Sequence, residues 1–116
     1  MPTPLTTSFS VSPTSPAAGT VVNVAVKIVN TSNHKVEIGP EVYVYEGAMS
    51  YSNPNVVRLS SEGVFLSKTG TPGATYEKSF EFQVPVDKPS GTLYTAHLRV
   101  LQNGGATFHD APFTVQ

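Results

Sequence analysis

The sequence predicts an all-β protein that folds as a two-sheet antiparallel sandwich of seven to nine strands, with no helix. The first observation is that apolar side chains recur at every second position in several short runs, which places them on one face of a strand. The second is that no window repeats at the helical period between a start and a stop signal. The third is that nine glycines and ten prolines separate the runs with turn sequences. Many short strands separated by turns are typical of a sandwich.

Length, charge and cysteine content limit the classes of function. A chain of 116 residues fits one domain with its own apolar core. The formal net charge is -1 and the seven Lys and Arg residues are scattered, so we expect no nucleic-acid partner. No apolar run is long enough to cross a bilayer, so we expect no membrane insertion. The absence of cysteine removes disulfides, thiol catalysis and cysteine-bound zinc.

The chain divides at residue 8. Residues 1–8 contain two prolines and little to bury, so we expect an extended N-terminal arm, which either frays or lies on a neighbouring subunit. Residues 9–116 form the sandwich. Its first strand places Phe9 and Val11 on one face, and the prolines that follow confine this strand to a sheet edge.

The next three segments predict a central strand, a break and a second long strand. Residues 20–30 carry β-branched side chains at a density that favours a central position. Residues 35–38 predict a short strand or bend, which Gly39-Pro40 stops. Residues 41–46 alternate, with valines inward and tyrosines outward. The inward face of the central strand consists of Val22, Val24, Val26 and Ile28.

Three further strands are expected before the C-terminal region. Two of them are short and cover residues 56–59 and 63–66. The third covers residues 75–84, with phenylalanines and a valine inward and charged side chains outward. Lys78 has the inward parity in this strand, so we expect its ammonium group to reach water at the rim of the sandwich.

A hairpin closes the chain and shows the clearest alternation. Asn103-Gly104-Gly105 is a turn sequence, and a three-residue loop here pairs Val100 with Phe108 and points both inward. Phe113 has the opposite parity, so both phenylalanines face inward only if residues 110–112 form a bulge. The inward face of the first hairpin strand consists of Tyr94, Ala96, Leu98 and Val100.

Three stretches follow the pattern of a known domain type. Residues 9–32 read as a strand, a Pro-Ala-Ala-Gly-Thr turn and a valine ladder that ends in Asn-Thr-Ser. Residues 90–96 place Tyr94 at the entrance of a later strand, and residues 106–115 read as a closing strand. Together they resemble bacterial and archaeal immunoglobulin-like domains, including the adhesion-associated CARDB type. The resemblance implies an immunoglobulin-like sandwich and a non-catalytic role in binding or spacing; the Cys and Trp of antibody domains are absent.

The sequence shows no catalytic or metal-binding motif, and we expect neither an enzyme nor a cofactor. Glu77 and Glu81 share a strand face, but they point outward and read as solvated charges. The three histidines are His34 in a turn, with His97 and His109 on paired strands. A zinc site needs a third ligand and no neighbouring cation, so we interpret all three as surface histidines.

The candidate binding residues are aromatic and basic side chains on one outer face. If residues 41–46 pair with residues 92–102, tyrosines and histidines share that face, and the adjoining loop extends it. Tyr, Met and Arg are enriched in protein interfaces, so we predict a contact surface for a protein partner. Ordinary cover of the sheet and a sugar-binding platform are the alternatives. The predicted partner-binding residues are Tyr43, Tyr45, Met49, Tyr51, His97, Arg99 and His109.

These observations predict a non-catalytic structural or adhesive module that makes protein–protein contacts on a cell surface or particle. The alternatives are an accessory (decoration) protein of a virion lattice and a carbohydrate-binding accessory domain, whose partner would be a polysaccharide. Residues 1–4 show no signal-peptide pattern. The expected location is extracellular, on a cell surface or on a virion surface.

Overall fold

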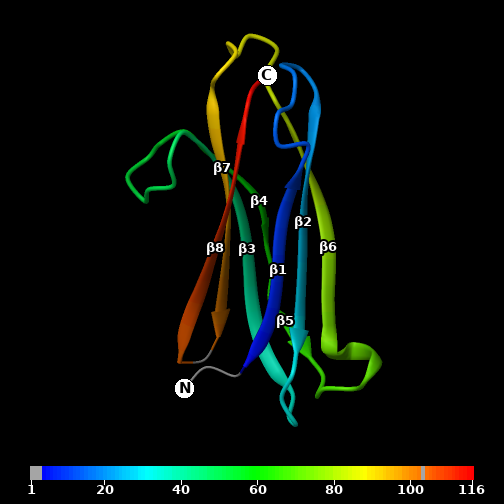
Figure 1. Ribbon diagram of the computed structural model, residues 1–116. Coiled ribbons are helices and arrows are strands. Elements are labelled where there is room, and N and C mark those ends of the chain that lie inside the picture. Colours follow the sequence, from blue (N-terminus) through cyan, green and yellow to red (C-terminus); the bar gives the residue numbers. More distant parts are fainter. Residues whose placement is uncertain (1–3, 103) are drawn as a thin grey trace.

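The computed structural model describes residues 4–102 and 104–116, and it shows two antiparallel sheets packed face to face (Figure 1). Eight strands are present in this part of the chain. A single 3₁₀ turn, η1 (Pro72–Ala74), lies between two of them, and the described residues contain no α-helix. The strands are β1 (Leu5–Ser12), β2 (Val21–Asn30), β3 (Val36–Glu46), β4 (Val56–Ser61), β5 (Val64–Leu66), β6 (Thr75–Gln83), β7 (Leu93–Gln102) and β8 (Gly105–Thr114).

The strand order confirms the predicted fold class. The smaller sheet has the order β1-β2-β6, and the larger sheet has the order β4-β3-β7-β8, with β5 also paired to β3. All pairs are antiparallel. This is the immunoglobulin-like arrangement, in which strands A, B and E face strands C′, C, F and G.

The core lies between the sheets and comes from the predicted alternation. The inward side chains of β2 and β7 are fully buried, whereas the residues between them in β2 are exposed or half-buried. Lys78 lies at the rim, half exposed, and forms an ion pair with Glu62 (3.1 Å). The fully buried side chains include Val22, Val24, Val26, Ile28, Ile38, Val42, Val44, Leu66, Val84, Leu98, Val100 and Phe113.

Strand β3 runs through Gly39-Pro40, so the predicted stop at this dipeptide is wrong. The Pro40 carbonyl accepts a hydrogen bond from the Glu62 N–H (3.2 Å), on the side of β3 where β4 and β5 pair. The Pro40 nitrogen faces the same side, at the gap between the β4 and β5 ladders. Because no ladder bond is lost there, proline is tolerated inside a long central strand.

The N-terminal boundary also differs from the prediction. Residues 5–8 are not an arm but the first half of β1, where Leu5 pairs with Asn30 and Ser8 pairs with Lys27. Leu5 is half-buried against the core, which explains why this segment joins the sheet. Residues 1–3 of the predicted arm lie outside the described residues.

The β7–β8 hairpin has a different register from the predicted one. Gln102 pairs with Gly105, so the loop has two residues, of which Asn103 lies outside the described residues and Gly104 has φ +95°. A slip of one residue moves every side chain to the other face. Phe108 therefore points outward, opposite Arg99, and the ladder continues without the predicted bulge at residues 110–112. This register keeps Ala111 and Phe113 buried without interrupting the ladder.

Candidate functional site

Five of the seven predicted binding residues line one small cavity on the outer face of the larger sheet. We call these five side chains the outer-face cluster. Strands β3 and β7 are neighbours, with Tyr43 paired to His97 and Tyr45 to Thr95, and the loop at 47–55 adds Tyr51. The cavity has a volume of about 130 Å³. The cluster consists of Tyr43, Tyr45, Tyr51, His97 and Arg99.

Met49 and His109 do not line this cavity. Met49 is half-buried in the loop before β4. His109 pairs with Leu98 and has the inward parity of β8, because the hairpin register differs by one residue from the predicted one. It lines a separate cleft between the edges of β1 and β8, together with Leu5 and Thr7.

A carboxylate that the sequence analysis missed holds Arg99 in place. The Arg99 Nε donates to Glu41 Oε1 (2.7 Å), and its terminal nitrogen also contacts this carboxylate. The Tyr43 hydroxyl donates to the same oxygen (3.4 Å). The hydrogen bond to Glu41 raises the pKa of Arg99 above its usual value, with a smaller charge contribution from the same group. The pair orients a guanidinium group and neutralises its charge.

His97 is buried, so its interpretation as a surface histidine is wrong. It is 2% exposed, because its ring stacks on Phe108 (centroids 5.8 Å apart) and Tyr45 covers it edge-on (6.1 Å). Its Nδ1 lies 2.6 Å from Asp110 Oδ1. Its Nε2 is buried and makes no hydrogen bond within the described part of the chain. The contact with Asp110 therefore fixes the orientation of the ring.

The sequence did not predict that Phe108 and Asp110 lie beside the outer-face cluster, because their position depends on the register of the β7–β8 hairpin. With a two-residue loop Asp110 stands opposite His97 and Phe108 stands opposite Arg99, whereas a three-residue loop points both away from the cluster. The Asn103-Gly104 dipeptide is the sequence signal for a two-residue loop. Glu41 shares the parity of Tyr43 in β3, and its role follows from the pairing of Glu41 with Arg99.

The tyrosines of the cluster differ in exposure and in orientation. Tyr51 is 71% exposed, Tyr43 is half-buried and Tyr45 is buried. Burial raises the pKa of Tyr45, with a smaller contribution from Tyr43, so its hydroxyl stays protonated at neutral pH. The Tyr43 and Tyr45 rings are tilted by 40° with centroids 6.3 Å apart. The three rings therefore do not form one flat exposed platform.

The outer faces of the two sheets have different compositions. The larger sheet exposes aromatic and branched side chains on its outer face, with Phe65 at 61% and Phe108 at 52%. The β1 residues on the outer face of the smaller sheet are serine and threonine, and Val21 is the large apolar side chain exposed on that face within the described residues. Exposed apolar residues that gather on one face mark interaction surfaces. Those on the larger sheet are Val56, Phe65, Leu93, Leu101 and Phe108, with Tyr51 from the adjoining loop.

Within residues 4–102 and 104–116, no group of three or more His, Cys, Asp or Glu side chains is placed to hold a metal ion. No helix in the same residues has the length and apolar character needed to span a membrane.

No protein-family model matches the chain, and no curated protein sequence matches it. Similar folds occur in solved structures. The DNA glycosylase AlkC of Pseudomonas fluorescens, bound to DNA with an abasic site analog, matches with a TM-score of 0.65 and 15% identity, over 97% of this chain and 30% of AlkC. A β-glucosidase of Listeria innocua in complex with gluconolactone matches with a TM-score of 0.64 and 18% identity, over 97% of this chain and 16% of the enzyme.

The sporulation control protein Spo0M of Bacillus subtilis matches with a TM-score of 0.61 and 14% identity, over 97% of this chain and 49% of Spo0M. The chain therefore spans less than half the length of each of these three proteins. At such low identity the similarities show a shared sandwich fold and do not extend to function.

Proposed function

We propose that this domain is a non-catalytic binding module that contacts a protein partner through the outer face of its larger sheet. The observation that carries the proposal is the asymmetry between the two outer faces, of which one exposes aromatic and aliphatic side chains and the other mainly polar and charged side chains. An adhesive or structural role on a cell surface or particle, including a virion lattice, is the setting in which such a module acts. The resemblance of the sequence to CARDB-type domains agrees with this role.

The chemistry of the face favours a protein over a polysaccharide. Exposed Tyr51 and Phe108 lie beside an arginine that Glu41 already orients, which is the combination enriched in protein interfaces. A sugar platform needs aromatic rings that are exposed and coplanar, whereas Tyr45 is buried and tilted by 40° from Tyr43. The chain also contains no tryptophan.

Photo-crosslinking in the producing cell tests this proposal. Replacing Phe108 or Leu101 by photoreactive benzoylphenylalanine puts the probe on the outer face of the larger sheet. We expect illumination to join each variant to the same protein, which mass spectrometry then identifies. Ser10 and Ser79 are the matched control positions, because they are exposed on the outer face of the smaller sheet.

Adducts from Ser10 and Ser79 but not from Phe108 and Leu101 would reject the proposed face. The absence of a protein adduct from all four positions, together with retention of the domain by a soluble polysaccharide in affinity electrophoresis, would replace the proposal with the carbohydrate-binding alternative.

A further inference from the structure

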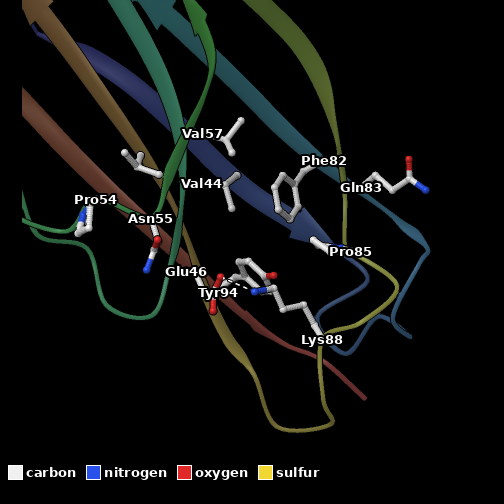
Figure 2. Close-up of a pocket in the computed structure, with 11 residues that line it drawn as sticks. Val44, Glu46, Pro54, Asn55, Val57, Phe82, Gln83, Pro85, Lys88 and Tyr94 are labelled. Carbon is white, nitrogen blue, oxygen red and sulfur yellow. Dashed lines mark hydrogen bonds and ion pairs between the residues drawn. The ribbon is translucent and has the colours of Figure 1, made fainter.

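A second and larger cavity opens between the two sheets, away from the outer-face cluster. It lies where the edge strands β4 and β6 face each other, and its volume is about 390 Å³, within the usual range of small-molecule sites. Figure 2 shows Phe82 reaching in from β6 opposite Val44 and Val57, with Tyr94 beyond them. The lining is therefore mainly apolar, with a few polar groups.

The hydroxyl group of Tyr94 is the unexplained feature of this cavity. Tyr94 is 3% exposed, and its hydroxyl group makes no hydrogen bond to any described residue. Leaving a buried polar group unpaired is unfavourable for folding. The ring is held firmly, since it stacks on Phe113 (5.2 Å, 10° between planes) and packs against Phe82 (5.4 Å). The hydroxyl group is thus preorganised to pair with a group that enters the cavity.

An ion pair at the mouth determines the charge of the occupant. Lys88 Nζ lies 2.8 Å from Glu46 Oε1, and both side chains are partly exposed. Figure 2 shows the Lys88 side chain passing beside the Tyr94 hydroxyl. Because each charge already has its partner, a charged occupant would break the pair or leave its own charge uncompensated. Burial also raises the pKa of Tyr94, which keeps the hydroxyl group neutral and able to donate.

We propose that this cavity is a binding site for a small uncharged organic molecule with an aromatic or branched aliphatic body and one hydroxyl group. The body packs against Val44, Val57 and Phe82, and the hydroxyl group pairs with that of Tyr94. The cavity shares no lining residue with the outer-face cluster: Val44 and Tyr94 point between the sheets, whereas the cluster points away from them. Val56, which is exposed on the partner face, borders the cavity. The binding of a small molecule in this cavity can therefore be tested without reference to the proposed protein-binding face.

Two probes of the same shape test this assignment. p-Cresol carries a methyl and a hydroxyl group on a benzene ring, and p-xylene replaces the hydroxyl group with a second methyl group. We expect both to shift the amide NMR signals of residues around Val44, Val57 and Phe82 in a saturable way. The hydrogen bond to Tyr94 should make p-cresol bind about threefold to tenfold more tightly than p-xylene after correction for their transfer from water.

Three variants make the test specific. Tyr94→Phe should abolish the preference for p-cresol while p-xylene still binds, and Tyr43→Phe, which removes a tyrosine hydroxyl group on the outer face, should leave both affinities unchanged. Val57 is half exposed at the mouth, so Val57→Trp should block both probes without disturbing the core. The proposal is wrong if p-cresol gives no saturable shifts, if the shifts lie elsewhere, or if Tyr94→Phe keeps the full preference. Unchanged binding in Val57→Trp would also overturn it.

Discussion

At the scale of single residues, Asn30 is the buried polar side chain that joins three segments of the chain. It is fully buried at the end of β2, and its Nδ2 donates to the carbonyl groups of His34 and Ser67 (both 2.9 Å). Its Oδ1 accepts from the N–H (2.9 Å) and hydroxyl group (2.7 Å) of Ser32. The burial of Asn30 could not be predicted from the sequence, because a polar residue next to a turn normally faces water.

Replacing Asn30 by alanine should therefore be strongly destabilising. We expect Asn30→Ala to lower the free energy of unfolding by about 2–4 kcal/mol, since it leaves several buried groups without partners. Urea denaturation measures this change. Asn23→Ala, at an exposed position of the same strand, is the control and should change stability by about 0.5 kcal/mol or less. Equal effects of the two substitutions would contradict the role assigned to Asn30.

Glu62 gives the fold a dependence on pH. Its carboxylate accepts hydrogen bonds from Tyr76 and Lys78, and these lower its pKa below the usual value of 4.5, with Tyr76 as the largest cause. A carboxylate whose pKa is lower in the folded than in the unfolded state stabilises the fold at pH values above its unfolded-state pKa. This stabilisation is lost as the pH falls through the folded-state pKa. Below that range the folded protein no longer gains from the ionised carboxylate.

Glu62→Gln should therefore be destabilising at neutral pH, and its difference from the unmodified chain should shrink as the pH is lowered below 4.5. Urea midpoints measured for both proteins across the acid range give this difference directly. A deficit that stays constant with pH would show that the ionised carboxylate is not what stabilises this contact.

At the scale of elements, the β7–β8 hairpin shows what alternation can and cannot predict. Alternation correctly gave the inward face of β7, from which Tyr94, Ala96, Leu98 and Val100 join the core. Alternation could not give the register of β8, because the register depends on the length of the loop. A three-residue loop therefore led to the prediction that Phe108 and Phe113 both point inward. The prediction that a strand ends at Pro40 was wrong for a similar reason. Proline is tolerated there because it lies at the gap between β4 and β5, and this gap depends on the pairing of distant residues.

The hairpin register predicts that two phenylalanines in the same strand differ sharply in their contribution to stability. Phe113→Ala should cost about 3–5 kcal/mol, because Phe113 is fully buried between Phe82 and Tyr94. Phe108→Ala should cost about 1 kcal/mol or less, since its main ring contact is the stack on His97. Chemical denaturation of the two variants measures both values. Comparable losses would mean that Phe108 is in the core and that the register is wrong.

At the scale of the whole molecule, the two sheets present outer faces of unlike composition. The parity of each strand predicted where Tyr43, Tyr45, His97 and Arg99 would lie, and the structure brings these four together. The burial of His97 could not be predicted, because it depends on ring contacts with Phe108 and Tyr45. Cavities between sheets, such as the one beside Tyr94, likewise depend on how edge strands diverge and leave no periodic signal in the sequence.

The most direct test of the binding face is the affinity of the cross-linked partner for two charge variants, measured by isothermal titration calorimetry. Phe108→Glu and Ser10→Glu each place one carboxylate at an exposed outward position, on the larger and the smaller sheet respectively. We expect Phe108→Glu to weaken binding by about tenfold or more, as at the centre of an interface, and Ser10→Glu to leave the affinity unchanged. Full affinity in Phe108→Glu, or an equal loss in both variants, would contradict the proposed binding face.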